Sequence, residues 1–350
     1  MTGLTLITGG AGFVGTNLAD RILSDGGRVR VFDDLSRPGV EENLRWLTKR
    51  HGDAVDVEIA DIRDARAVDR AMAGAERAFH LAAQVAVTTS LDEPARDATI
   101  NLHGTLNLLE AARARSRPPT LLFTSTNKVY GGLEDVELAR RASRYEPTDP
   151  ELLGHGIGER RPLRFCTPYG CSKGAADQYV LDYAHSYGLP TIVFRMSCIY
   201  GPHQFGTEDQ GWVAHFLIRA LEGEPITVFG DGKQVRDVLY VEDLVDAFLL
   251  AAGDSRRLSG QAFNIGGGVR NCLSLVELID LIAEQQGQAP QISHGDWRRG
   301  DQRYYVSDTS AFEAATGWRA RTSPQEGVLR LARWLRARSG ERRDSTVAVA

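Results

Sequence analysis

The amino-terminal end of the chain reads Leu4-Thr5-Leu6-Ile7-Thr8-Gly9-Gly10-Ala11-Gly12-Phe13-Val14-Gly15. The first five residues predict a strand, and Gly9, Gly12 and Gly15 predict a tight turn that opens a helix running from Phe13 to about Asp25. Glycines at this spacing let a pyrophosphate approach the helix amino terminus, where backbone N–H groups and the helix dipole favour anions. A glycine-rich turn alone is weak support, but this one has the required strand–turn–helix context. The stretch therefore predicts dinucleotide binding.

Short apolar runs alternate with helical segments over the first two thirds of the chain. Further strands are predicted at residues 28–33, 55–60, 77–81, 120–124 and 191–195, and helices at residues 99–115, 173–187, 273–286 and 324–337. This alternation predicts an α/β fold, a Rossmann-type doubly wound parallel sheet with a smaller α+β domain. We assign residues 1–199 and 235–271 to the Rossmann domain, 200–234 and 272–337 to the smaller domain, and 338–350 to a disordered tail. Gly230-Asp231-Gly232-Lys233 predicts a hairpin turn.

Composition narrows the possible partners. The chain has 350 residues, 25% charged residues and a formal net charge of −5. It has no basic block interleaved with aromatic residues, so we expect no nucleic-acid partner. The four cysteines form no CxxC pair and no metal-ligand spacing, which predicts reduced thiols in a cytoplasmic protein and no metal site. There is no signal-peptide pattern and no apolar run of the roughly 20 residues that span a bilayer.

Several positions are candidates for contacts with a dinucleotide. Asp33 ends the second predicted strand, 18 residues after Gly15. A carboxylate there can accept hydrogen bonds from the ribose hydroxyls and would repel a 2′-phosphate, which favours NAD over NADP. Asp34 leaves the register open. Asp61-Ile62 could meet the adenine edge, and Leu81-Ala82-Ala83 offers small residues near the cofactor, although both could be purely structural.

The candidate catalytic residues are Thr126, Tyr169 and Lys173. Thr126 lies in a hydroxyl-rich segment, Thr124-Ser125-Thr126, that ends an apolar strand, and Thr124 is a further candidate cofactor contact. A tyrosine with a pKa near its ordinary value of about 10 is a poor base at neutral pH. A lysine ammonium four residues later, together with a positive nicotinamide ring, would favour the phenolate. Such a phenolate could take the proton from a sugar hydroxyl while a hydride leaves the attached carbon. Thr126 would form a hydrogen bond to the same hydroxyl oxygen and orient it. Tyr130 is a rival, but no lysine follows it at that spacing.

These motifs make the chain similar to the extended short-chain dehydrogenase/reductases of the NAD-dependent nucleotide-sugar epimerase/dehydratase group. The resemblance covers about residues 4–335 and is most specific in Thr8–Gly15 and the Tyr169/Lys173 pair. Segments 125–131, 168–179, 209–212 and 232–237 resemble the CDP-paratose (CDP-tyvelose) 2-epimerases. The resemblance implies a smaller domain that binds the nucleotide sugar, an NAD that stays bound, and catalytic roles for Thr126, Tyr169 and Lys173.

Asn127 and Lys128 stand where dehydratase relatives carry an Asp-Glu pair. An amide cannot supply a useful acidic proton and a lysine is not a carboxylate base, so water elimination loses its acid–base pair. Epimerisation does not need this acid–base pair. The configuration of a ring carbon that bears a hydroxyl can be inverted by oxidation to a keto-sugar, rotation and re-reduction. The resemblance to the CDP-paratose 2-epimerases implies that this epimerisation takes place at C2 of a CDP-hexose or CDP-6-deoxyhexose. The alternatives are an NDP-sugar 4-epimerase, a net oxidoreductase, or a non-catalytic dinucleotide-sensing protein.

Substrate contacts are expected at both ends of the nucleotide sugar. Arg236 and Arg303 resemble arginines that bind the diphosphate, although surface salt bridges would explain them too. Thr88, with Thr89 and Ser90, could bind sugar hydroxyls or cap a helix. By resemblance, Asn127, Lys128, Gln210 and Trp212 are also placed near the substrate, and Asn264 and Gly266 near the nucleotide. Cys198 stands where many relatives have asparagine.

Two further features concern shape. Residues 132–165 form a long polar insertion, which could be functional or only a surface flap. Relatives usually dimerise through the helices after the fourth and fifth strands. The apolar character of Ile100, Leu106, Leu109, Tyr179 and Tyr183 allows a homodimer or higher oligomer, but core packing would explain these residues equally.

Overall fold

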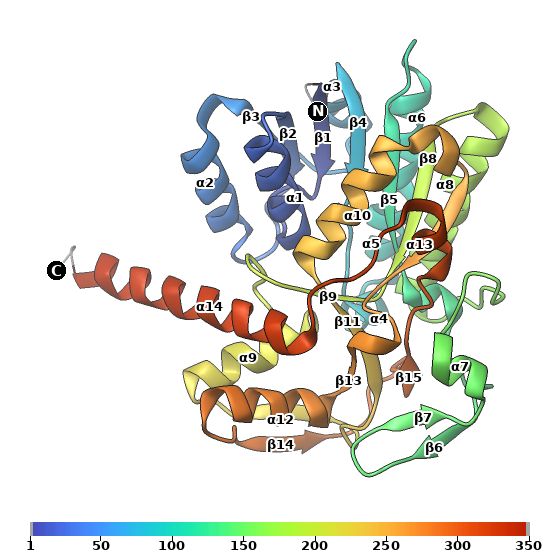
Figure 1. Ribbon diagram of the computed structural model, residues 1–350. Helices are drawn as coiled ribbons and strands as arrows, with labels where there is room; N and C mark the ends of the chain where they lie inside the picture. The colour runs from blue at the N-terminus through green and yellow to red at the C-terminus, as the bar shows by residue number, and fades with distance from the viewer. Residues whose placement is uncertain (1–2, 348–350) are drawn as a thin grey trace.

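The computed structural model describes residues 3–347, with side chains for residues 3–338. Its centre is a seven-stranded parallel sheet in the order β12-β8-β5-β4-β1-β2-β3 (Figure 1). The strands are β1 (Leu4–Thr8), β2 (Arg28–Asp33), β3 (Val55–Ile59), β4 (Ala75–His80), β5 (Thr120–Thr126), β8 (Thr191–Met196) and β12 (Gln261–Ile265). The strand order reverses between β1 and β4, which is where doubly wound sheets bind ligands. The predicted Rossmann-type fold class is confirmed.

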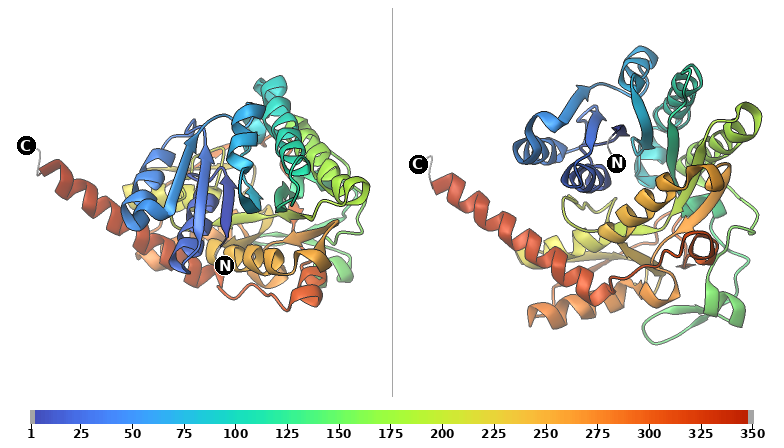
Figure 2. Two further views of the ribbon diagram at one scale, coloured as in Figure 1. Left: turned by 90° about the horizontal axis from the view of Figure 1, so that it is seen from above. Right: turned by 45° about the horizontal axis from the view of Figure 1, so that its top comes forward.

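Helices cover both faces of this sheet (Figure 2). One face packs against α1, α2 and α10 through residues such as Leu18, Leu47 and Phe248. The other packs against α3, α6 and α8 through Val68 and Val180, among others. The bounds are α1 (Phe13–Ser24), α2 (Val40–His51), α3 (Ala65–Met72), α4 (Val87–Asp92), α5 (Pro94–Ala98), the π-helix η2 (Thr99–His103), α6 (Gly104–Arg113), α8 (Thr167–Tyr187), α10 (Val241–Gly253), α11 (Ser255–Leu258) and α13 (Ser310–Thr316).

A smaller layered unit lies beyond the carboxyl ends of the central strands (Figure 1). Its strands are β9 (Cys198–Tyr200), β11 (Val235–Tyr240), β13 (Cys272–Ser274) and β15 (Tyr304–Tyr305), with a separate pair of β10 (Ile226–Phe229) and β14 (Ile292–Gly295). Its helices are α9 (Trp212–Glu222), α12 (Leu275–Gln286) and α14 (Pro324–Val347). The segment predicted as Rossmann at 235–271 is divided, because β11 joins the smaller sheet and β12 the central one. The division into two domains otherwise stays a prediction.

Two local predictions were wrong. The turn at Gly230–Lys233 does not make a hairpin, because β10 pairs with β14 while β11 pairs with β9, β13 and β15. The tail predicted as disordered from residue 338 is helical as far as Val347, and residues 348–350 lie outside the described residues. Glutamate and arginine in this segment are good helix formers and no proline interrupts them. The Arg338 guanidinium also binds the Glu42 carboxylate on α2.

The insertion at 132–165 packs against both units. It contains β6 (Leu138–Arg140), β7 (Tyr145–Pro147) and α7 (Pro150–His155). The Arg144 guanidinium binds Glu277 of α12, and the backbone N–H of Asn264 on β12 donates to the Glu159 carboxylate at 2.7 Å. The insertion is therefore a structural link. Among the described residues, no helix is long and apolar enough to cross a membrane.

Candidate active site

A cavity of about 710 Å³ opens at the carboxyl ends of β1, β4 and β5, and its wall includes residues of the smaller unit. It brings together nearly all of the residues that the sequence singled out. These are Gly9, Gly12, Phe13, Val14, Asp33, Asp61, Ile62, Leu81, Ala82, Ala83, Thr88, Thr124, Thr126, Asn127, Lys128, Tyr169, Lys173, Gln210 and Arg236. No residue of the 132–165 insertion is part of this wall. The lining residues come from segments between Gly9 and Asp301 that are far apart in sequence, and only the fold brings them together.

The glycine-rich turn has no room for side chains. Gly9 has a φ of +70°, and a Cβ there would lie 2.7 Å from the Ala82 amide nitrogen. A Cβ at Gly15 would lie 2.3 Å from the Gly9 carbonyl oxygen. Such contacts are shorter than any relaxed packing, so the turn, the β4 loop and α1 meet only because these residues are glycines. The result is a backbone cradle that fits a pyrophosphate at the amino end of α1.

Asp33 is fixed against this cradle. Its carboxylate accepts hydrogen bonds from the backbone N–H groups of Ala11 (3.1 Å) and Leu35 (2.9 Å). Burial raises the pKa of Asp33, and the two backbone donors oppose that rise. The Asp34 carboxylate instead bonds the exposed Ser36. The predicted adenine contact Asp61 is held by the Arg63 guanidinium, which lowers the pKa of the Asp61 carboxyl.

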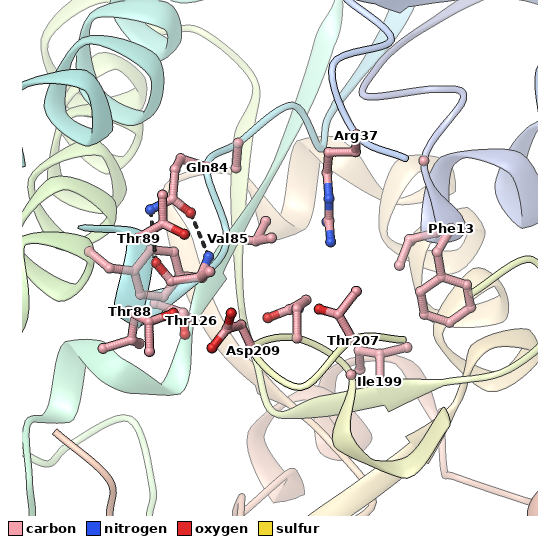
Figure 3. Close-up of a pocket in the computed structure, with 18 of the residues that line it drawn as sticks. Phe13, Arg37, Gln84, Val85, Thr88, Thr89, Thr126, Ile199, Thr207 and Asp209 are labelled. Atoms are coloured by element: carbon pink, nitrogen blue, oxygen red, sulfur yellow. Dashed lines mark hydrogen bonds between the residues drawn. The ribbon is translucent and has the colours of Figure 1, made fainter. Parts of the chain in front are cut away.

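Arg37 is a lining residue that the sequence analysis missed. Figure 3 shows its side chain pointing into the cavity. Burial lowers the pKa of Arg37, while the Asp33 charge opposes that shift. A cation aimed into a cavity beside a glycine cradle suits an anionic ligand. With Asp33 and the cradle, these residues fit a bound NAD.

Thr126, Tyr169 and Lys173 meet where β5 and α8 pack together. Thr126 is the last residue of β5, and its hydroxyl accepts a hydrogen bond from the Lys128 backbone N–H at 3.3 Å. Pro168 lies in the first turn of α8, where its fixed φ suits a helix start, and places Tyr169 over the cavity. The Thr126 hydroxyl acts on the Tyr169 phenol by lowering its pKa, against the effect of burial. The Lys173 ammonium lies 4.1 Å from the centre of the Phe123 ring.

Electrostatics at this point differ from the simplest expectation. Burial raises the pKa of Tyr169 to about 12, although the Thr126 hydroxyl opposes the shift. Burial also lowers the pKa of Lys173 to about 7, against the attraction of Asp177 and Asp97. The protein groups by themselves therefore hold Tyr169 as a phenol. The additional positive charge of an oxidised nicotinamide ring is needed to favour the phenolate.

Two hydroxyl groups in the cavity wall have no hydrogen-bond partner within the described chain. They are Thr88 Oγ1 and Ser125 Oγ, both shielded from solvent. Thr88 and Thr89 lie within α4, whose N-cap is Ala86, so they are not caps. Ser90 is different, because its hydroxyl donates to the Val87 carbonyl and does not line the cavity. The open hydroxyls near Thr126 suit a ligand rich in hydroxyl groups (Figure 3).

At the far end of the cavity, cations and one carboxylate are packed together. The Lys128 ammonium donates to the Gly300 carbonyl and to Gln302 Oε1, both at 3.3 Å. Burial and the nearby Arg236 lower the pKa of Lys128 to about 8. Arg236 is 6% exposed, and its guanidinium binds the Asp301 carboxylate at 2.6 Å. Asp301 therefore offsets the charge that Arg236 could offer to a diphosphate.

Arg303 does not line the cavity, and its contact with the diphosphate stays a prediction. Its guanidinium lies 5.7 Å from the Tyr145 ring centre and 5.4 Å from that of Trp297. Arg298 and Arg299, earlier in the same loop, line the cavity instead. Arg298 crosses to the facing loop and donates to the Glu208 carboxylate at 2.8 Å. The sequence could not choose among these arginines, because the path of the loop decides which of them faces inward.

The remaining predicted contacts divide into two groups. Trp212 and Cys198 line the cavity, as does Asp209 (Figure 3). Asn264 and Gly266 do not. Asn264 Oδ1 accepts a hydrogen bond from the buried Tyr130 hydroxyl at 2.8 Å. Asn264 and Tyr130 therefore belong to the core. Tyr130 is thereby removed as a rival base. The described residues contain no group of three or more His, Cys, Asp or Glu that could hold a metal ion.

Comparisons with known proteins agree with this geometry. Residues 5–266 match the model of the NAD dependent epimerase/dehydratase family. The chain is 44% identical to CDP-paratose 2-epimerase of Salmonella typhi, over 94% of this chain and 98% of that protein. It is 34% identical to UDP-glucose 4-epimerase of Mycolicibacterium smegmatis, over 96% and 99%. The crystal structure of Thermus thermophilus UDP-glucose 4-epimerase with NAD superposes with a TM-score of 0.80 at 32% identity, covering 95% and 99% of the two chains.

The family resemblance drawn from the sequence is thus confirmed, and NAD is the cofactor that the cradle, Asp33 and the family share. The match extends over both the dinucleotide turn and the Tyr169/Lys173 pair. The chain belongs to the NAD-dependent epimerase/dehydratase family.

Proposed function

We propose that the protein inverts the configuration at C2 of a CDP-activated hexose or 6-deoxyhexose. One observation carries the proposal. Thr126, Tyr169 and Lys173 line the same cavity as the glycine cradle, in a chain 44% identical to CDP-paratose 2-epimerase over nearly its whole length. The position of inversion and the CDP group rest on that relative, while the redox chemistry rests on the cavity.

The residues divide the reaction between them. NAD, when held along Gly9–Gly15 with its ribose at Asp33, supplies a hydride acceptor and donor. Tyr169 takes the proton from the C2 hydroxyl as the C2–H bond is broken, and Thr126 orients that oxygen. The Lys173 ammonium favours the Tyr169 phenolate. The keto-sugar then rotates within the cavity, so that the opposite face of C2 is presented for reduction. As C2 is reduced on that face, Tyr169 returns the proton to the oxygen on C2.

The side chains at positions 127 and 128 support epimerisation rather than elimination. Asn127 Oδ1 accepts a hydrogen bond from the Thr126 hydroxyl at 3.3 Å, and the Lys128 ammonium is held by Gly300 and Gln302. Neither side chain is a carboxyl group that could protonate a leaving hydroxyl or remove a carbon-bound proton. We assign both to substrate positioning instead.

For the rest of the substrate we assign the sugar hydroxyls to Thr88 and Gln210. The diphosphate is assigned to Arg236, Arg298 and Arg299, which line the cavity. Paired guanidinium–phosphate hydrogen bonds suit arginine better than lysine. Asp301 binds Arg236 through Nη2, so the diphosphate is assigned to the remaining N–H groups of that guanidinium.

The proposal is tested with CDP-sugars deuterated at C2, by NMR of the product. Inversion at C2 with deuterium kept on C2 supports it, because the hydride leaves and returns without reaching solvent. Inversion of UDP-glucose at C4 with no reaction at C2 of a CDP-sugar would favour the 4-epimerase alternative. Stoichiometric NADH formation would favour a net oxidoreductase. Bound NAD without turnover of any sugar would favour the alternative of a non-catalytic dinucleotide-sensing protein.

We further propose a homodimer through the exposed side of α6 and α8. Leu109 and Tyr183 belong to the core of the subunit, but Tyr179 is 44% and Tyr187 54% exposed on α8. Exposed aromatic residues on one helix suit a protein interface. Light scattering of the protein and of Tyr179→Arg tests this, since the variant should be monomeric. The four free cysteines suit a reducing compartment, so we place the enzyme in the cytoplasm.

A further inference from the structure

Asp97 is a buried carboxylate beside the catalytic pair that the reaction has not yet used. It lies on α5 and is 1% exposed. Its Oδ1 accepts hydrogen bonds from Asn101 Nδ2 and Gln84 Nε2, each at 3.1 Å, and its Oδ2 accepts one from the Ser172 hydroxyl. All three donors are neutral. Within the described chain Asp97 has no hydrogen bond to a cationic side chain, so its negative charge is not cancelled by a contact of that kind.

The cation that acts on Asp97 is Lys173, the residue after Ser172 in α8. Its side chain is also buried, at 3% exposure, and a buried ammonium is costly unless a negative charge lies nearby. The Asp177 carboxylate on the same helix raises the pKa of Lys173 more than Asp97 does, but both of its oxygens are bound by Arg195, at 2.9 Å each. His80 on β4 stays neutral, because burial lowers its pKa to about 3.

Asp97 is therefore the negative charge acting on Lys173 that has no cation of its own among the described residues. It attracts Lys173 and also disfavours the charged form of Tyr169. A carboxylate that serves the lysine must not come too close to the phenol. The hydrogen bonds from Ser172 and Asn101 fix Asp97 to α8 and η2, so its position relative to the pair is set by the fold.

We propose that Asp97 is a positioning residue, the fixed counter-ion that keeps Lys173 protonated so that Lys173 can favour the Tyr169 phenolate. The proposal rests on the assigned roles of Tyr169 and Lys173. Burial already lowers the pKa of Lys173 to about 7 with Asp97 present. Loss of the Asp97 charge lowers that pKa further, so the lysine becomes a neutral amine at a lower pH.

The test follows the ionisation of Lys173 without depending on turnover. Lysine labelled with ¹³C at Cε is titrated by NMR in the NAD-loaded protein, and the Lys173 signal is assigned with Lys173→Arg. In Asp97→Asn the midpoint should fall by about one pH unit, in the range for loss of a nearby opposite charge. Ser172→Ala is the matched control, because it removes a hydrogen bond and keeps the charge, so its midpoint should stay near that of the wild type. Asp97→Ser is a second neutral variant should Asp97→Asn not fold.

Activity supplies an independent readout. If the wild type epimerises CDP-sugars, the alkaline limb of its kcat profile should move to lower pH in Asp97→Asn by the same amount as the NMR midpoint. An unchanged midpoint in a folded, NAD-loaded neutral variant overturns the role of Asp97, whether or not the enzyme turns over. Absence of epimerase activity in the wild type overturns the proposed function, and leaves the NMR comparison to decide on Asp97.

Discussion

Replacement of Lys173 by methionine tests the electrostatic core of the mechanism. Burial places the pKa of Tyr169 at about 12, so at pH 8 only about one molecule in ten thousand would carry the phenolate without help. Bringing the ionisation to about pH 8 requires about 5 kcal/mol, since each pKa unit corresponds to about 1.36 kcal/mol. An adjacent opposite charge supplies about one to three units, and the nicotinamide ring must supply the rest. Lys173→Met should therefore lose about 10- to 1000-fold in kcat below about pH 7, where Lys173 carries its positive charge.

The sign of the pH effect follows from which form is active. The phenolate is the base, and removal of the ammonium raises the pKa of Tyr169, so activity should appear only at higher pH. The kcat profile is followed by NMR of the sugar product. The apparent pKa of its acid limb should rise by about one to three pH units. Lys233→Met is the control, because Lys233 does not line the cavity and its ammonium donates to the Arg141 carbonyl. An unchanged acid limb in a Lys173→Met protein that retains NAD would refute the reasoning.

Three further changes probe the site. Tyr169→Phe should keep bound NAD, seen in the absorbance spectrum, yet lose nearly all turnover, and undiminished activity would remove Tyr169 as the base. Gly15→Ala should lower the free energy of unfolding by about 1–3 kcal/mol and weaken NAD binding, because its Cβ meets the Gly9 carbonyl oxygen. Gly154→Ala, a helical glycine with no atom within 4 Å of the added Cβ, should be neutral or stabilising by up to about 1 kcal/mol in the same denaturant titration. Arg37→Gln should raise the Kd for NAD about tenfold in calorimetry, the effect of about 1.4 kcal/mol, and an unchanged Kd would show that the guanidinium does not face the cofactor.

Sequence reasoning succeeded where function depends on neighbours along the chain. The β1 strand, the glycine turn and Asp33 form one local pattern, and Tyr169 and Lys173 share one helix face because they are four residues apart. The capping box of α12 likewise depends only on Ser274 and Glu277, three residues apart, and it is present.

It failed where the fold decides which side chain faces inward. Arg303 and Arg298 lie five residues apart in one loop, and only the path of that loop turns Arg298 into the cavity. Asp97 accepts a hydrogen bond from Ser172, which lies 75 residues away in the chain, so only the fold brings it beside the catalytic pair. Arg37 sits in an unremarkable polar run, and no periodicity marks it. The turn at Gly230–Lys233 carries hairpin residues, yet the strands beside it find other partners across the sheets.

The link formed by the 132–165 insertion has a consequence for how a sugar enters. By bonding Glu277 of α12 and Asn264 of β12, it acts as a strut between the two halves of the enzyme and resists a swing of one against the other. In the cavity wall, the partly exposed Arg298–Glu208 ion pair joins two loops. Such pairs contribute only about 0–1 kcal/mol, so the two loops can part at little cost. We therefore expect a nucleotide sugar to enter and leave by local parting of these loops, while the insertion holds the two units together.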